Sequence, residues 1–163
     1  MKSPDKPKQT RAPKLLGDFG EGLATYTLIR KGFEVAYVDH VGADLIAEKN
    51  GMRFAISVKT RLFRNGSRES LAFVAEDQHL KKLEYFANQF GMTPMFALII
   101  CIADEDSIHL LLAKSEDIQN GLPKVRHGYA FRFAKSKRQQ LIEQQFIDYS
   151  CWTGEVIGNK NFN

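Results

Sequence analysis

The sequence predicts an α/β domain in which helices flank a central mixed β-sheet. The expected elements run helix, three strands, helix, strand, and this succession is typical of a mixed α/β layer architecture. Asn50-Gly51 is a hairpin signal between two of the strands, and an amphipathic helix follows at 77–90. The 163 residues, 44% hydrophobic and 26% charged, suit one globular domain of ordinary composition.

The first expected helix covers about residues 14–31. Its apolar side chains recur at intervals of three and four from Leu16 to Leu28, and Gly32 supplies a left-handed stop. Residues 1–14 contain five basic side chains and one acidic side chain, and they account for the whole net charge of +4. We expect them to be a disordered basic arm, so that residues 15–163 form the single domain.

Three strands are expected next, at 33–38, 43–49 and 52–61. The two-residue turn Asn50-Gly51 favours a type I′ geometry, which fixes the register of the strands on either side. In that register Asp44 lies opposite Ser57, and Lys59 shares their face because side chains alternate along a strand.

The remaining elements are a short strand, a helix that Gly91 ends, three further strands and a last helix. Their expected ranges are 71–75, 77–90, 95–103, 107–113, 129–134 and 136–151. Residues 124–152 extend beyond the helix, three strands, helix and strand of the core, and the apolar side chains of 141–149 either close the core or form a dimer face.

Several classes of protein are disfavoured by composition and motifs. The longest apolar run, 95–103, is shorter than the roughly 18 residues of a membrane span, and no secretory h-region follows the basic start, so we expect a cytoplasmic protein without membrane contact. Cys101 and Cys151 are too few for an all-cysteine zinc site, and Cys101 is expected to be a buried thiol. The sequence has no GxxxxGK[ST], GxSxG or HExxH motif, and the histidines show no ligand spacing.

The hairpin presents one polar patch. Its other face is apolar, whereas this face carries Asp44, Ser57, Lys59 and Arg61. An aspartate and a lysine so placed can serve phosphodiester hydrolysis, because the carboxylate binds a divalent cation and the lysine stabilises charge on phosphate oxygens. The alternative is a surface cross-strand pair worth a few tenths of a kcal/mol.

The arrangement around this pair resembles the PD-(D/E)XK nuclease superfamily, and within it the Holliday-junction-resolvase-like branch. The matching segments are GDFGE at 17–21, KGFEV at 31–35, GADLI at 42–46, SVKTR at 57–61 and Gln78. The resemblance implies a restriction-endonuclease-like fold and a metal-dependent endonuclease acting on DNA, on branched or repair intermediates. It also implies a homodimer.

Carried over by position, the resemblance assigns a role to each residue. Asp44 is the central metal ligand, Glu21 a second carboxylate from the first helix, and Lys59 the catalytic lysine. Gln78 orients Lys59, a water or a phosphate, and the backbone carbonyl of Val58 completes the metal shell. The metal is Mg²⁺ (or Mn²⁺), which suits oxygen ligands.

One position departs from the family pattern. Ser57 stands where the family carries a glutamate beside the metal, and a serine is a weak, neutral ligand. A catalytically lapsed nuclease-fold protein that binds DNA or serves as an accessory subunit is therefore a second hypothesis. A domain that never touches nucleic acid is a third, since residues 15–163 carry no net charge.

Two basic stretches are the candidate DNA surface. Residues 53–68 and 124–138 contain basic side chains and no acidic ones, which is the footprint expected of a phosphate-binding surface. The individual candidates are Arg61, Arg64, Arg68, Lys135, Lys137 and Arg138. The alternative is a solvated face of ordinary charged residues.

Overall fold

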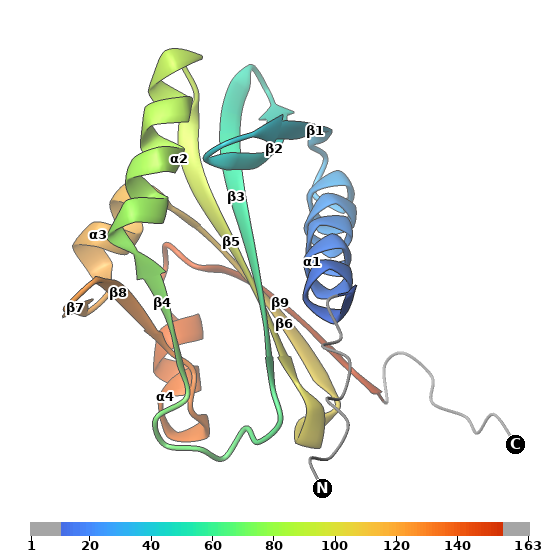
Figure 1. The fold of residues 1–163 in the computed structure, drawn as a ribbon, viewed down its shortest axis with the longest axis vertical. Coiled ribbons are helices and arrows are strands. Elements are labelled where there is room, and N and C mark those ends of the chain that lie inside the picture. The colour runs from blue at the N-terminus through green and yellow to red at the C-terminus, as the bar shows by residue number, and fades with distance from the viewer. Residues whose placement is uncertain (1–10, 155–163) are drawn as a thin grey trace, which may run out of the picture.

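The computed structural model describes residues 11–154 (Figure 1). The helices are α1 (Arg11–Arg30), α2 (Asp77–Gln89), α3 (Ser115–Gly121) and α4 (Lys135–Ile142), with a 3-10 turn η1 (Ala103–Glu105). The strands are β1 (Glu34–His40), β2 (Ala43–Lys49), β3 (Met52–Phe63), β4 (Ala72–Glu76), β5 (Thr93–Ile102), β6 (Ser107–Lys114), β7 (Lys124–Val125), β8 (Gly128–Arg132) and β9 (Asp148–Thr153).

A mixed six-stranded sheet forms the centre of the molecule. Its strand order is β1-β2-β3-β5-β6-β9, in which β3 and β5 run parallel and every other neighbouring pair is antiparallel. A smaller sheet has the order β4-β8-β7. The predicted α/β class with a central mixed sheet flanked by helices is confirmed.

The β2–β3 hairpin forms as the sequence predicts. Asn50 and Gly51 have φ of 54° and 78°, the left-handed conformation that a type I′ turn requires at both positions. The ladder pairs Lys49 with Met52 and continues to Leu45 opposite Ile56, which is the expected register. The two-residue turn thereby decides which residues of β2 and β3 share a face.

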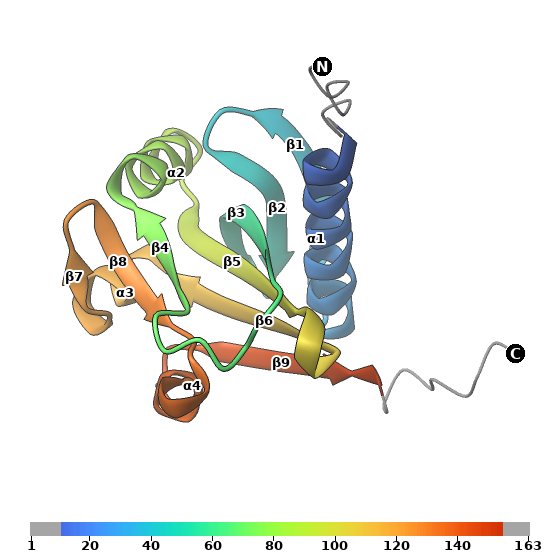
Figure 2. The ribbon, with the colours of Figure 1, turned by 60° about the horizontal axis from the view of Figure 1, so that its bottom comes forward.

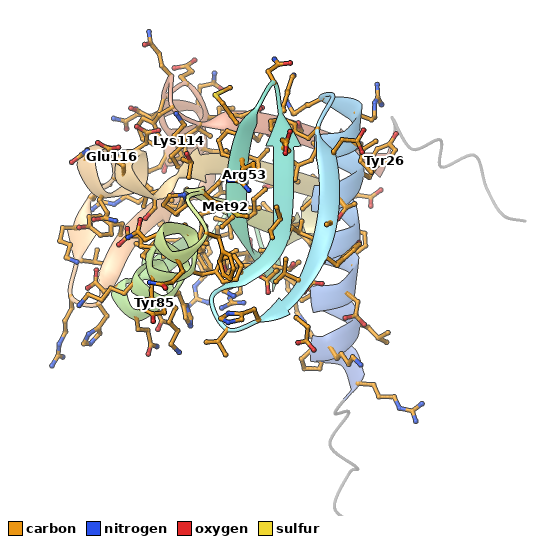
Figure 3. All side chains as sticks on the ribbon, turned by 90° about the horizontal axis from the view of Figure 1, so that it is seen from above. Tyr26, Arg53, Tyr85, Met92, Lys114 and Glu116 are labelled. Atoms are coloured by element: carbon orange, nitrogen blue, oxygen red, sulfur yellow. The ribbon has the colours of Figure 1, made fainter. Side chains whose placement is uncertain are left out.

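Two apolar layers cover the two faces of this sheet. Ala24 and Leu28 of α1 pack with Leu45 and Ile56 on one face. Leu83 of α2 belongs to the cluster on the other face, together with residues of β4 and β8. Viewed from the β2–β3 turn, α1 with Tyr26 and α2 with Tyr85 lie on opposite sides of the hairpin (Figure 3).

The structure differs from the sequence-based expectation at both ends. Helix α1 begins at Arg11, so residues 11–14 are helical, and the rest of the proposed arm lies outside the described residues. The expected helix over 136–151 ends at Ile142, and β9 then pairs with β6. The pairing with β6 decides this, because an edge strand is stabilised by its neighbour rather than by local periodicity.

The apolar side chains from the end of α4 onward close the core. Leu141 and Ile147 are buried, and Phe146 and Tyr149 pack against the same cluster. They are therefore not a free dimer face. Helix α3 and strand β7, which the sequence analysis did not predict, connect β6 to β8. Both cysteines are free, and Cys101 is only half-buried.

No helix within residues 11–154 is long and apolar enough to cross a membrane.

Candidate functional site

Asp44 lies where β2 begins, beside a central strand that continues past it. The backbone ladder between β2 and β3 is recorded up to Leu45 and Ile56. Beyond that pair, the Asp44 side chain joins the two strands, because its Oδ2 accepts a hydrogen bond from the backbone N–H of Val58 at 2.6 Å. The carboxylate is thus fixed at the point where the two strands separate, and its other oxygen, Oδ1, has no hydrogen bond among the described residues.

Ser57 faces the same carboxylate. Its hydroxyl donates to Oδ2 of Asp44 at 3.4 Å, and the residue is only 4% exposed because β3 lies inside the sheet. The predicted proximity of Asp44 and Ser57 is therefore confirmed. Ser57 adds a hydroxyl dipole to the site where a glutamate would add a negative charge.

Gly20 brings α1 close to β3 beside this carboxylate. A Cβ at Gly20 would lie 1.8 Å from Oγ1 of Thr60, so only glycine permits this approach. Thr60 Oγ1 is buried without a hydrogen-bond partner among the described residues. The close contact fixes the position of Glu21, the next residue of α1, relative to β3.

Glu21 lies within electrostatic reach of Asp44. Burial raises the pKa of Glu21, the charges of Asp44 and Asp18 raise it further, and Lys59 lowers it. A carboxyl group whose pKa is raised by neighbouring carboxylates lies in a local excess of negative charge, which a cation relieves. The charges of Asp44 and Lys59 thus both act on Glu21, and the joint role of the three residues as one site stays a prediction.

Lys59 is half-buried on β3 and takes part in none of the ion pairs recorded within residues 11–154. Its charge affects Glu21 on α1 and also His79 on α2. The ammonium group therefore acts electrostatically on a residue of each of the two helices that flank the sheet. An unpaired, partly dehydrated cation in that position can stabilise charge on a phosphate.

Gln78, the remaining expected member of the site, has an exposed side chain near the start of α2. Its amide donates to Glu76 at 2.7 Å, and the exposed side chain lines a surface depression with Lys81 and His127. The physical reason is helical phase, because the buried face of α2 carries Leu80 and Leu83 and one residue turns a helix by about 100°.

His79 takes the inward position instead. It is half-buried, four residues before the buried Leu83, and so lies on the flank of α2 that faces the sheet. Burial lowers the pKa of His79, and the charges of Lys59, Lys82 and Arg61 lower it further, while Glu76 opposes them. The sequence analysis missed His79 because it sought ligand spacing. The phase of α2 is the signal that could have found it.

The candidate DNA-binding residues separate into free and paired groups. Arg61 lies with its guanidinium carbon 5.1 Å from the centre of the Phe73 ring, and Arg61, Arg64 and Arg68 are exposed and outside the recorded ion pairs of residues 11–154. These three arginines follow Lys59 along the chain. Between them the backbone N–H of Gly66 donates to Asp104 at 2.9 Å, which ties the loop to η1.

Arg138 does not lie on the surface as expected. Both of its terminal nitrogens donate to Glu105, at 2.6 and 3.2 Å, and its side chain is 14% exposed. Its guanidinium also stacks on Phe133. Arg138 therefore joins α4 to η1, while Lys135 is 3.9 Å from the same Glu105 and Lys137 is exposed and in no recorded ion pair within residues 11–154.

The donor atoms at the site suit a hard cation. Within residues 11–154 no three histidine, cysteine or acidic side chains are grouped as metal ligands. Glu21 and Asp44 supply two carboxylates, and Mg²⁺ in proteins is commonly held by one or two carboxylates and several waters. The residues present therefore suit Mg²⁺ or Mn²⁺ that keeps several water ligands, rather than a metal ion whose ligands all come from the protein.

Comparisons with known proteins identify the fold. No protein-family model and no curated protein matches the chain. Among solved structures, the chain is similar to Hjc, a Holliday junction resolvase from the archaeal hyperthermophile Archaeoglobus fulgidus, with a TM-score of 0.52 and 17% sequence identity. The alignment covers 76% of this chain and 88% of the resolvase. The chain thus has a restriction-endonuclease-like fold similar to that of this resolvase.

Proposed function

We propose that the protein is a metal-dependent endonuclease that hydrolyses phosphodiester bonds of DNA. The observation that carries the proposal is the grouping of Glu21, Asp44 and Lys59 around the point where β2 and β3 separate, on a resolvase-like fold. The motifs GADLI and SVKTR, which resemble the PD-(D/E)XK pattern, supply Asp44 and Lys59.

In this proposal Asp44, Glu21 and the backbone carbonyl of Val58 hold Mg²⁺ or Mn²⁺. The cation, when bound, polarises the phosphate and lowers the pKa of water. Asp44 is kept ready by its hydrogen bond from Val58, and the negative charge it shares with Glu21 favours the cation.

The remaining residues act on the DNA. Lys59 stabilises the negative charge that builds up on the phosphate oxygens as a water oxygen bonds to phosphorus and a deoxyribose oxygen leaves. Arg61, Arg64 and Arg68 hold the neighbouring phosphates, because a planar guanidinium can donate two hydrogen bonds to one phosphate. Branched or repair intermediates are the proposed substrates, and a homodimer is the proposed assembly, on the strength of the resolvase resemblance.

The test is cleavage of branched and linear DNA by the full chain in Mg²⁺ and in Mn²⁺. Asp44→Ala should lower the cleavage rate at least 100-fold and leave DNA binding within a few-fold of the wild type. Asp39→Ala is the matched control, because Asp39 is an exposed aspartate on the adjacent β1. Cleavage that survives in Asp44→Ala would refute the assignment.

Ser57 keeps a second function open to the same experiment. A wild-type chain that binds DNA with a steep salt dependence but cleaves none of these substrates would be a lapsed nuclease that acts by binding. In that case Ser57→Glu, which restores the family's carboxylate next to Asp44, is the variant to assay for Mg²⁺ binding.

A further inference from the structure

A cavity of about 180 Å³ lies outside the candidate nuclease site. Residues 121–123, strand β8 and helix α4 with the turn after it enclose the cavity, and none of its lining residues belongs to α1, β2 or β3. In Figures 1 and 2, α4 and β8 lie on the far side of the central sheet from α1. Neither Asp44 nor Glu21 lines the cavity.

One face of α4 and the following turn is polar where it meets the cavity. Lys137, Gln140, Leu141 and Gln144 line it, with the i, i+3, i+4, i+7 spacing of a single helix face. Lys137 and Gln140 are exposed, so they form the rim of the cavity, while Leu141 is buried beneath them. The opposite wall is apolar, formed by Leu122, Pro123 and Ala130.

The cavity is positively charged. Arg132 and Lys137 line it, and no acidic side chain does. Neither residue belongs to an ion pair recorded within residues 11–154, whereas the neighbouring cations Lys135 and Arg138 are held by Glu105. The positive charges of Arg132 and Lys137 are therefore available to bind an anionic ligand.

The size and the walls restrict the ligand. A cavity of about 150 Å³ accepts a benzene-sized ring, so this one accepts a single aromatic ring system the size of a nucleobase. Glutamine amides offer both donors and acceptors, which is what a base edge requires, and Arg and Lys bind phosphate.

We propose that this cavity binds one nucleotide, with the base against Leu122, Pro123 and Leu141 and the phosphate between Arg132 and Lys137. Gln140 and Gln144 contact the base edge. The ligand is either a free nucleoside monophosphate or an unpaired nucleotide of a DNA strand, which share this chemistry. The proposal goes beyond the nuclease function and does not depend on it.

The experiment is titration of the ¹⁵N-labelled full chain with dAMP, with inorganic phosphate, and with a hairpin DNA carrying one unpaired adenine, followed by NMR. We expect dAMP to shift amides of residues 121–144 and to bind at least tenfold more tightly than phosphate. Lys137→Ala and Arg132→Ala should each weaken dAMP at least fivefold. Lys135→Ala, an exposed lysine on the same helix, and Asp44→Ala should leave it unchanged.

A second variant distinguishes the contribution of the apolar wall from that of the charged rim. Ala130→Leu fills the apolar wall, so it should abolish the preference for dAMP over phosphate without removing phosphate binding. If the hairpin with the unpaired adenine binds more tightly than dAMP and Lys137→Ala weakens that binding, the natural ligand is a nucleotide of a DNA strand. If dAMP binds more tightly than the hairpin, the natural ligand is a free nucleotide. No saturable dAMP binding, equal binding of dAMP and phosphate, or insensitivity to Arg132→Ala and Lys137→Ala would each overturn the proposal.

Discussion

At the residue scale, the site depends on the balance between two acids and one cation. Asp44 is held by the backbone N–H of Val58, and its charge adds to the burial that raises the pKa of Glu21. The charge of Lys59 lowers the pKa of Glu21 and also lowers the pKa of His79. One lysine is thus coupled electrostatically to both flanking helices.

Replacing that lysine tests the coupling. In Lys59→Met we expect the pKa of Glu21 and the pKa of His79 both to rise, because a nearby positive charge lowers the proton affinity of an acid and of a base alike. Side-chain NMR titrations of the carboxyl and imidazole groups measure both. Lys135→Met, on the far helix α4, is the control and should change neither pKa. A shift confined to one of the two groups would show that Lys59 is not coupled to both α1 and α2.

At the element scale, the fold could be predicted where local sequence decides geometry. The Asn50-Gly51 turn fixed the register that brings Asp44 to Ser57, and the structure has that register. The start of α2 was also predicted, but which of its side chains turn toward the sheet depends on the phase of Leu80 and Leu83, which leaves Gln78 exposed and His79 half-buried. A helix boundary alone does not carry that information.

Strand β9 is an element whose structure the local sequence did not predict. Residues 136–151 have apolar spacing that suits a helix, yet residues after 147 pair with β6 from Ser107 to Leu112. Contact with a strand about 40 positions away decides their structure, and no local pattern encodes it. The same holds for Arg138, whose partner Glu105 is 33 residues distant.

The contact between α1 and β3 gives a prediction for these two elements. Gly20→Ala places a Cβ against the Thr60 side chain, so α1 must shift, and we expect a loss of roughly 1–3 kcal/mol in the free energy of unfolding. DNA cleavage should fall further than stability explains, because Glu21 moves with the helix. Urea denaturation beside cleavage assays measures the two effects.

A second substitution checks the cause. Thr60→Ala removes the hydroxyl that the new methyl group meets, so Gly20→Ala/Thr60→Ala should recover part of the lost stability. Gly22→Ala is the matched control on the same helix, where a Cβ meets nothing. Gly22→Ala should be neutral or stabilising, because alanine favours a helix over glycine. A Gly22→Ala variant as destabilised as Gly20→Ala would show that the contact with Thr60 is not the cause.

At the scale of the whole molecule, a buried histidine links the edge of the central sheet to its core. His109 on β6 is 3% exposed, and its ring bonds to Ser107 at 2.9 Å and to the Tyr149 hydroxyl on β9 at 2.8 Å. Burial lowers the pKa of His109 to about 4, with Arg138 lowering it further and Glu105 opposing. The edge strand therefore depends on an imidazole that stays neutral.

The sign of the resulting pH dependence follows from the two states. The unfolded chain binds a proton at His109 near its ordinary pKa of 6.5, whereas the folded chain resists it down to about 4. Between these values the unfolded state holds more protons, so stability is complete above pH 6.5 and falls as the pH drops through the window. We expect a loss of about 2 kcal/mol between pH 7 and pH 5. Urea denaturation at these two pH values should show it, and His109→Gln, which cannot titrate, should lose most of the difference. An equal pH dependence in wild type and variant would mean that protonation elsewhere in the molecule governs its acid stability.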